Sequence, residues 1–331
     1  MEQCKVEDII TKAVVASRNN YYHKDLVRSF IDAIRLNGDL FLNTNVIDVK
    51  NNNGFRIEVD VINSILDKYK DMESLISKTD DTKISDNLLN SKVYEKLGVL
   101  YVIFDGNTYT MLEMMILGLL THNAVIFAYD GYMGGCNTLL INIAESFFKK
   151  QKISTDIFQQ SLTIRANEFF KNHKSIDKTV IIGNSEFVDK YLKECTTEVV
   201  VARFNSYDLY VEDITHLDLI NKIMELGLDV NLYIKEGIAT DNEEAIIVAD
   251  VDEAITNINY NGGKYSSSIF TSDSNNAGIF IRDVKSKHVF VNTSPTYERS
   301  LDVKQEDLLR EKSILLPNIY KFDGSKVDIN I

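Results

Sequence analysis

The feature that most constrains the fold of this chain is a series of short apolar runs that alternate with segments of helical periodicity. The first run, residues 97–104, reads Leu-Gly-Val-Leu-Tyr-Val-Ile-Phe, and the second, residues 121–127, ends in Ala-Val-Ile-Phe. Runs that are apolar without alternation are typical of strands buried on both faces, which occur in parallel sheets covered by helices. The sequence therefore predicts an α/β fold built on a parallel sheet.

The same alternation extends over most of the chain and defines two groups of elements. In the first group we expect strands at 99–104, 124–128, 179–183 and 199–201, with helices at 137–150 and 185–195. The last three of these strands should lie in one parallel sheet, joined by right-handed crossovers. In the second group we expect helices at 214–226, 251–260 and 274–284, with strands at 245–249, 267–271 and 288–291. Upstream, residues 5–75 have helical spacing, residues 80–91 predict a polar surface loop, and residues 92–105 are rich in β-formers.

Composition and charge exclude several classes of protein. The 331 residues can hold two domains, and 44% hydrophobic residues are typical of a globular chain. A net charge of -13 leaves no basic excess to neutralise phosphates, so we expect no nucleic-acid binding. The longest apolar run, residues 111–120, contains Glu113 and is too short to span a bilayer, so we expect no membrane association.

The polar side chains give no sign of a disulfide framework or a metal site. The first six residues are polar and charged, which is unlike a secretory signal. The three cysteines, Cys4, Cys136 and Cys195, form no CxxC pair and are typical of reduced thiols in the cytoplasm. The five histidines share no ligand spacing, so we expect no metal: His23, His122, His173, His216 and His288. Asp213, His216 and Asp218 lie close together but favour a helix start, with Asp213 or Thr215 as the cap.

Several blocks of the sequence, in order, are similar to those of one known family. The first block runs without gaps over residues 97–137, and weaker similarity resumes at 177–191 and 197–213. Residues 252–266 begin Asp-Glu-Ala-Ile, end Asn-Gly-Gly-Lys-Tyr-Ser, and are similar to the family's segment DEAIxHINxYGSGHS. Residues 288–294, His-Val-Phe-Val-Asn-Thr-Ser, are similar to the family's strand AAVYVNAST. In these blocks the chain resembles the aldehyde dehydrogenase superfamily and within it γ-glutamyl phosphate reductase.

The resemblance implies an aldehyde dehydrogenase-like α/β fold, with a Rossmann-type parallel sheet and a shortened second α/β domain. Residues 1–212 would hold N-terminal helices and a dinucleotide-binding-like domain, and residues 213–306 a truncated catalytic-like domain. Residues 307–331 would form a C-terminal tail with a role in oligomerisation. Family members pair through a β-arm before the first Rossmann strand and through this tail, and residues 92–100 and 322–331 match those segments. We therefore expect a homodimer, with an active family member as a further partner.

The residues that would carry the family's reaction are missing. These enzymes attack an acyl group with a cysteine thiolate, but residues 227–234, which match that region, contain no cysteine, and neither does the chain beyond them. The family's Arg-Pro-Asn, whose Asn helps hold the oxyanion, falls on residues 107–109, where only Asn107 carries an amide. The family's phosphate-binding arginine falls on Ala128, and Asp130 adds a charge that would repel a phosphate. We therefore expect no catalytic residues.

A glycine-rich loop is the remaining candidate for cofactor binding. Residues 131–137, Gly-Tyr-Met-Gly-Gly-Cys-Asn, precede a helix, whose first N–H groups could bind an anion. The loop is not GxGxxG and lacks a lysine, so a plain entry into the helix is favoured. If a cofactor position survives, we expect it at Gly131, Gly134, Asn137 and Gly183. Cys136, if exposed, would have a lowered pKa at the helix start and is the alternative nucleophile.

These observations favour a catalytically inactive, γ-glutamyl phosphate reductase-like protein of the cytoplasm with a structural or regulatory role. We expect no cofactor, with NAD(P) as the alternative. Two other functions stay open. One is a divergent NAD(P)-dependent aldehyde or acyl-phosphate oxidoreductase that uses a relocated nucleophile such as Cys136. The other is a binding module that retains a nucleotide pocket. Turnover separates the first of these from a silent protein, and nucleotide binding separates the second.

Overall fold

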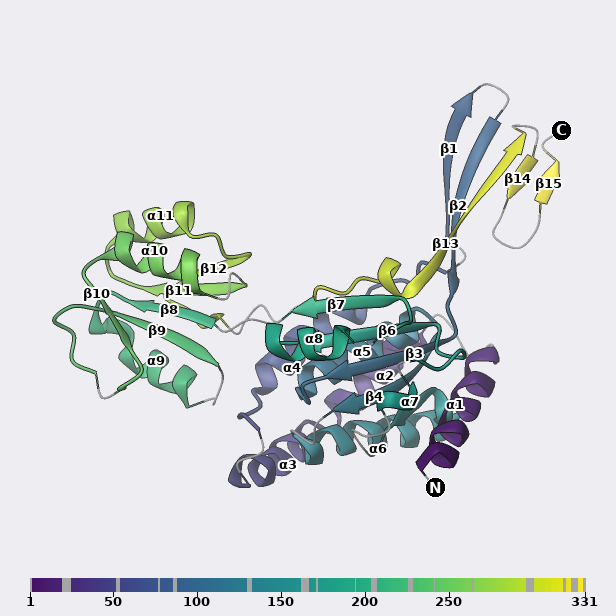
Figure 1. Ribbon diagram of the computed structural model, residues 1–331, viewed down its shortest axis with the longest axis horizontal. Helices are drawn as coiled ribbons and strands as arrows, with labels where there is room; N and C mark the ends of the chain where they lie inside the picture. Colours follow the sequence, from purple (N-terminus) through teal and green to yellow (C-terminus); the bar gives the residue numbers. More distant parts are fainter. Residues whose placement is uncertain are drawn as a thin grey trace.

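The computed structural model describes residues 2–19, 25–51, 54–76, 78–85, 88–129, 133–161, 167–170, 172–193, 195–203, 207–225, 229–240, 242–262, 265–295, 301–317, 320–322 and 327–329. Within them the chain forms two five-stranded sheets, one three-stranded sheet and one two-stranded hairpin. Figure 1 shows the five-stranded sheets as separate α/β units, with the three-stranded sheet extending away from the first unit. The expected α/β fold is confirmed.

The first unit is built around β3 (Val99–Phe104), the central strand of a sheet with the order β5-β4-β3-β6-β7. Its neighbours are β4 (Ala124–Tyr129) and β6 (Lys178–Gly183), and the edges are β5 (Phe158–Gln160) and β7 (Val199–Arg203). Every pairing in this sheet is parallel. The prediction that the strands at 124–128, 179–183 and 199–201 share one parallel sheet is therefore confirmed.

Helices cover both faces of the first sheet, which explains why all six residues of β3 are buried. Alternate residues of a strand point to opposite faces. Leu100, Val102 and Phe104 pack into one hydrophobic core with residues of α2 (Leu26–Arg35), α4 (Val59–Lys70), α5 (Thr108–Leu120) and α6 (Gly134–Gln151). Val99, Tyr101 and Ile103 pack into a second core with residues of α1 (Glu2–Arg18), α7 (Asn167–Phe170) and α8 (Ser185–Leu192). The helix α3 (Gly38–Lys50) lies against α6. The described part of the chain thus begins with four helices, α1 to α4, and the N-terminal region is helical as predicted.

The second unit repeats the arrangement on a smaller scale. Its parallel sheet has the order β10-β9-β8-β11-β12, with bounds Ile246–Val248, Val230–Lys235, Tyr207–Val211, Ser266–Phe270 and His288–Val291. The helix α9 (Leu217–Met224), which follows a short 3-10 turn (Ile214–His216), contributes to the core on one face. The helices α10 (Val251–Asn261) and α11 (Ser274–Asp283) contribute to the core on the other. β8 and β9 were not predicted from the sequence.

The three-stranded sheet, called the arm below, joins two distant parts of the chain. It consists of β1 (Thr79–Ser85), β2 (Leu88–Lys96) and β13 (Leu309–Pro317), all antiparallel. The ammonium of Lys92 lies 3.0 Å from the carboxylate of Glu311, and that of Lys312 lies 2.6 Å from Glu95. Such cross-strand charge pairs add a little stability to a ladder that is otherwise held by its backbone. A hairpin of β14 (Tyr320–Phe322) and β15 (Val327–Ile329) completes the C-terminal region.

The arm corrects one prediction. We expected residues 80–91 to form a polar surface loop, but residues 79–85 and 88–96 are strands. Polarity misled the prediction because these strands are held by backbone hydrogen bonds between strands, which polar side chains permit. The predicted β-rich segment 92–105 divides at Gly98, whose φ of +134° suits glycine alone. A Cβ at this position would lie 2.6 Å from the carboxylate of Asp177.

The C-terminal segment before β13 is attached to the first unit by buried polar contacts. The backbone N–H of Leu301 donates to the carboxylate of Glu113, and the amide of Asn123 donates to the carbonyl of Leu308. The ammonium of Lys178 donates to the carbonyl of Asp307. Leu301, Val303 and Leu308 belong to the same hydrophobic core as α2 and α5. Residues 301–308 therefore belong with the first unit in space, although they follow the second in sequence.

Sheet membership also bears on the boundary that we expected after residue 212. β7 of the first sheet ends at Arg203 and β8 of the second begins at Tyr207. The chain therefore passes from one sheet to the other before residue 207.

Among the helices that the structure describes, none has the length and apolar character that a membrane-spanning helix requires.

We predict that Asn123→Ala destabilises the protein by about 2–4 kcal/mol, because it leaves buried backbone groups without partners. The side chain of Asn123 is fully buried, accepts from the N–H of Gly98 at 2.8 Å and donates to the carbonyl of Leu308 at 2.8 Å. Urea unfolding followed by circular dichroism measures the change. The control is Asn43→Ala on the exposed side of α3, which should change the stability by less than about 0.5 kcal/mol. Equal effects of the two substitutions would contradict the prediction.

Candidate functional site

The carboxyl edge of the first sheet is where a parallel sheet of this kind positions a ligand. In such sheets ligands bind beyond the carboxyl ends of the strands, at the point where the connections diverge to either side. Here the divergence lies between β3 and β6, because β4 and β5 extend the sheet on one side of β3 and β6 and β7 on the other. Of the four predicted cofactor-binding residues, Gly183 ends β6 and both Gly134 and Asn137 lie in the first turn of the helix that follows β4. Gly131 lies outside the described residues, and Gly134, Asn137 and Gly183 can be placed.

Asn137 serves the packing of the first unit. Its side chain is fully buried in α6, donates to the carbonyl of Gly106 at 2.7 Å and accepts from the hydroxyl of Thr108 at 2.9 Å. Gly106 lies in the turn between β3 and α5 and Thr108 is the first residue of α5, so Asn137 joins the ends of two neighbouring β–α connections. Both ends of its amide therefore bind other groups of the protein.

The first turn of α6 is occupied by a carboxylate from another helix. The side chain of Asp48 in α3 accepts from the N–H of Gly135 at 3.1 Å and from the N–H of Cys136 at 2.9 Å. These are the groups with which a helix N-terminus would bind an anionic ligand. A Cβ on Gly135 would lie 2.7 Å from the same carboxylate, so glycine allows the approach. Gly134 begins this helix, and the predicted anion site is filled by Asp48.

Two other side chains cover the same edge. The ring of Phe187 in α8 lies against Gly183, where a Cβ would come within 2.6 Å of it. The side chain of Met133 is fully buried and lies against Gly54, where a Cβ would be 2.7 Å away. Met133 has a φ of +52°, a left-handed conformation uncommon outside glycine. The space beside Gly183 and beside Gly54 is therefore occupied by side chains of the protein itself.

Cys136 does not have the environment of a nucleophile. We expected a lowered pKa if the thiol were exposed, but it is fully buried. Burial, together with the nearby carboxylate of Asp48, raises the pKa of the Cys136 thiol far above its ordinary value. Of the other cysteines, Cys4 is exposed on α1, and Cys195 is half-buried with its thiol donating to the carbonyl of Tyr191. All three cysteines precede the second unit.

Asn107, which matches the family's oxyanion donor only loosely, has a structural role. Its side-chain oxygen accepts from the N–H of Tyr109 at 3.0 Å and so caps the start of α5. Its own N–H donates to the carboxylate of Asp105 at 3.0 Å. The turn after β3 is thus held by local contacts.

The carboxyl edge of the second sheet carries a buried acidic group that the sequence did not single out. Glu212 follows β8 and accepts from the amide of Asn276 at 2.6 Å, from the ammonium of Lys235 at 3.2 Å and from the hydroxyl of Thr271. The neighbouring Asp213 caps the turn before α9, as predicted. Burial acts to raise the pKa of Asp213, but hydrogen bonds from Thr215 and Ser272 outweigh it and lower the pKa to about 2.

The opposite, amino edge of the second sheet holds another buried polar group. The carboxylate of Asp208 accepts from the amide of Asn231 at 2.9 Å, and the hydroxyls of Ser267 and Ser286 lie 2.5 Å apart beside it. These networks at both edges tie neighbouring strands together. In the described ranges no three His, Cys, Asp or Glu side chains are grouped as metal ligands would be.

No family model matches the chain, but several curated proteins are similar to it over most of its length. It is 19% identical to the γ-glutamyl phosphate reductase of Dictyoglomus thermophilum, over 88% of this chain and 89% of that protein. It is 20% identical to the same enzyme of Alkaliphilus metalliredigens, over 90% of this chain and 88% of that protein. The alignment to the first extends over 370 positions, more than the 331 residues of this chain, so that relative has segments missing here.

Solved structures show the same fold. The γ-glutamyl phosphate reductase of Thermotoga maritima superposes with a TM-score of 0.57 at 14% identity, covering 95% of this chain and 98% of its own. Aldehyde dehydrogenase 21 of Physcomitrella patens superposes with a TM-score of 0.72 at 12% identity, covering 96% of this chain and 91% of its own. The glyceraldehyde-3-phosphate dehydrogenase GapN of Methanocaldococcus jannaschii, solved with NADP, has a TM-score of 0.69 at 12% identity and covers 94% of both chains.

The burial of Cys136 predicts its reactivity. In the native protein iodoacetamide should alkylate Cys4 first and Cys195 more slowly, and Cys136 at least about 100-fold more slowly than Cys4, because only an accessible thiolate attacks. In denaturant all three should react at similar rates. Mass spectrometry of peptides sampled over time gives the three rates. A native Cys136 that reacted as fast as Cys4 would show that the thiol is accessible after all.

Proposed function

We propose that this chain, which belongs to the aldehyde dehydrogenase superfamily and is related to γ-glutamyl phosphate reductase, is a noncatalytic member with a structural or regulatory role. The observation that carries the proposal is the occupied carboxyl edge of the first sheet. Asp48 binds the first N–H groups of α6, and Phe187 covers Gly183. An anionic cofactor at the start of α6 would have to displace the carboxylate of Asp48.

The missing nucleophile supports the same conclusion. The chain has no cysteine after Cys195, and Cys136 is buried beside a carboxylate that disfavours its thiolate. Loss of a nucleophile alone lowers the rate of covalent catalysis by orders of magnitude. The alternatives are a divergent reductase that uses Cys136 and a module that binds NAD(P) without turnover. GapN was solved with NADP, and this is the observation that favours the second alternative.

The proposal gives the arm a function in assembly. Among the described residues β1 and β13 form the two edges of this sheet, and backbone groups at a sheet edge can pair with another chain. β13 lies at one edge, and Leu315 on it is 58% exposed. We propose a homodimer that pairs through the arm or the C-terminal tail, with an active family member as a second partner. The proposal includes a cytoplasmic location, supported by three free cysteines.

The first test of the proposal is activity. We expect no NAD(P)H-dependent reduction of acyl phosphates and no oxidation of small aldehydes, followed by absorbance at the nicotinamide band. Cys136→Ala should behave like the wild type. Robust wild-type turnover that Cys136→Ala abolished would establish the divergent reductase instead. Saturable binding of NADPH without turnover, measured by calorimetry, would establish the binding module.

The second test is the oligomeric state. We expect light scattering to give twice the monomer mass of 37.7 kDa at high micromolar concentration. Leu315→Asp should shift the protein toward the monomer, because it places a charge on the exposed edge of the arm. The matched control is Leu36→Asp, which also charges an exposed leucine (87% exposed) but lies between α2 and α3. A monomeric wild type, or dissociation by both substitutions alike, would contradict assembly through the arm.

A further inference from the structure

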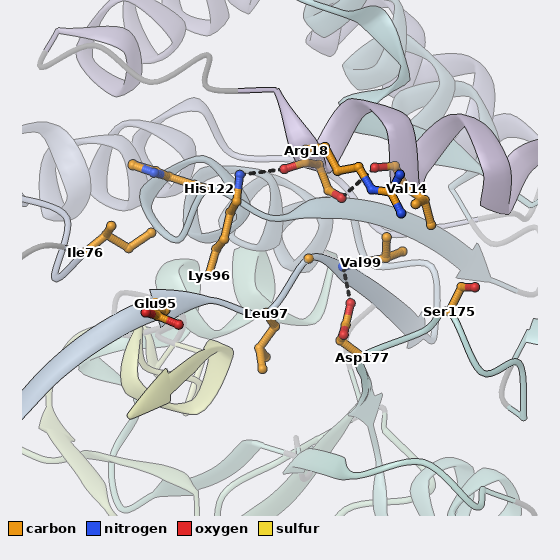
Figure 2. Close-up of a pocket in the computed structure, with 12 residues that line it drawn as sticks. Val14, Arg18, Ile76, Glu95, Lys96, Leu97, Val99, His122, Ser175 and Asp177 are labelled. Carbon is orange, nitrogen blue, oxygen red and sulfur yellow. Dashed lines mark hydrogen bonds between the residues drawn. The ribbon is translucent and has the colours of Figure 1, made fainter. Parts of the chain in front are cut away.

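A pocket of about 600 Å³ lies at the amino edge of the first sheet, opposite the candidate site. It is bounded by the C-terminal turn of α1, the junction between β2 and β3, His122 in the turn after α5 and the segment before β6. Figure 2 shows the side chain of Lys96 reaching from the end of β2 toward the end of α1, with His122 on one side of it. The pocket therefore forms where the arm joins the body of the protein.

The acidic residues of the pocket are bound to other groups of the protein. The carboxylate of Asp177 accepts from the N–H of Val99 at 2.8 Å, as Figure 2 shows. The carboxylate of Glu95 lies 2.6 Å from the ammonium of Lys312 in the arm. Both negative charges are thus engaged in holding β3 and the arm.

The two cations that line the pocket, Lys96 and Arg18, are not bound to a carboxylate in the described ranges. Lys96 donates to the carbonyl of Ser17 at 2.6 Å and so satisfies the C-terminal end of α1, and burial lowers its pKa. Arg18 is the last residue of α1 and is exposed. In the part of the chain that the structure describes, neither Lys96 nor Arg18 forms an ion pair with a carboxylate. A half-buried ammonium without an opposite charge is costly, and a bound anion would compensate it.

His122 makes the same wall polar without adding charge. Burial, and secondarily the neighbouring Lys96, lower the pKa of His122 to about 4, so the imidazole is neutral near pH 7. Val14, Ile76 and Leu97 supply apolar surface beside these groups. The pocket thus combines a positive end with an apolar wall, which suits an organic anion with a short carbon chain.

We propose that this pocket binds a small organic anion through its carboxylate or phosphate group, with Lys96 and Arg18 as the charged partners. Charge-assisted hydrogen bonds from lysine and arginine are the strong interactions available for such a group. The site lies at the opposite edge of the sheet from Asp48 and Cys136, and it shares no residue with them. It therefore stands whether or not the chain is catalytic.

The test measures binding of defined anions to the full-length protein. Inorganic phosphate, butyrate and succinate are titrated by calorimetry at constant ionic strength and pH 7. At least one should bind saturably with a dissociation constant below about 1 mM, which corresponds to roughly 4 kcal/mol. Butyrate or succinate binding more tightly than phosphate identifies a carboxylate ligand, and the reverse order identifies a phosphate ligand. No saturable binding of any of the three up to about 10 mM would overturn the proposal.

Substitutions locate the binding in the pocket. Lys96→Met and Arg18→Gln should each weaken it by roughly tenfold or more. Lys149→Met and Arg282→Gln remove surface cations elsewhere, each within 3.4 Å of a carboxylate, and should leave binding unchanged. If Lys96→Met fails to fold because α1 loses its C-terminal partner, Arg18→Gln decides, since Arg18 is exposed. Unchanged binding in a folded pocket variant, or equal losses in the controls, would overturn the proposal.

Discussion

The burial of β3 on both faces is the constraint on which the rest of the first unit depends. Its six residues are apolar or aromatic and all are buried, so helices must cover the sheet on both sides. The backbone around β3 also needs partners that helices cannot supply. Asn123 accepts from the N–H of Gly98, and Asp177 from the N–H of Val99. Asn123 in turn holds the carbonyl of Leu308, so the C-terminal segment is tied to the start of the central strand.

This tie explains how the arm is built. β13 follows directly after Leu308 and pairs along its whole length with β2, which leads into β3. Two strands separated by more than 200 positions thus meet because both are anchored at the amino edge of one sheet. The arm therefore extends directly from the start of β3. At that point the side chains of Lys96, Asn123 and Asp177 bind backbone groups of the neighbouring segments.

The sequence was informative where a pattern is local and misleading where a partner is distant. The runs around Val99 and Ala124 predicted parallel strands because burial on both faces leaves a continuous apolar signature. Residues 80–91 looked like a loop because they are polar. Residues 79–85 pair with the adjacent strand β2, and only β2 also pairs with the distant residues 309–317. At the candidate site, the absence of a cysteine from residues 227–234, the segment that resembles the family's nucleophile region, could be read directly from the sequence. The role of Asp48 could not, because nothing near residue 48 indicates that its carboxylate binds N–H groups in a helix that begins at Gly134.

The two edges of the first sheet differ in how their charges are satisfied. At the carboxyl edge, where this fold offers helix N-termini to an anion, Asp48 supplies the negative charge from within the chain. At the amino edge the relation is reversed. The end of α1 offers carbonyls, Lys96 covers one of them, and the positive charge that results has no carboxylate to balance it among the residues described there. At the carboxyl edge the N–H groups that could bind an anion therefore bind Asp48 instead. At the amino edge, where the arm begins, the charge of Lys96 favours an anion from outside the chain, which is the physical basis of the proposed pocket.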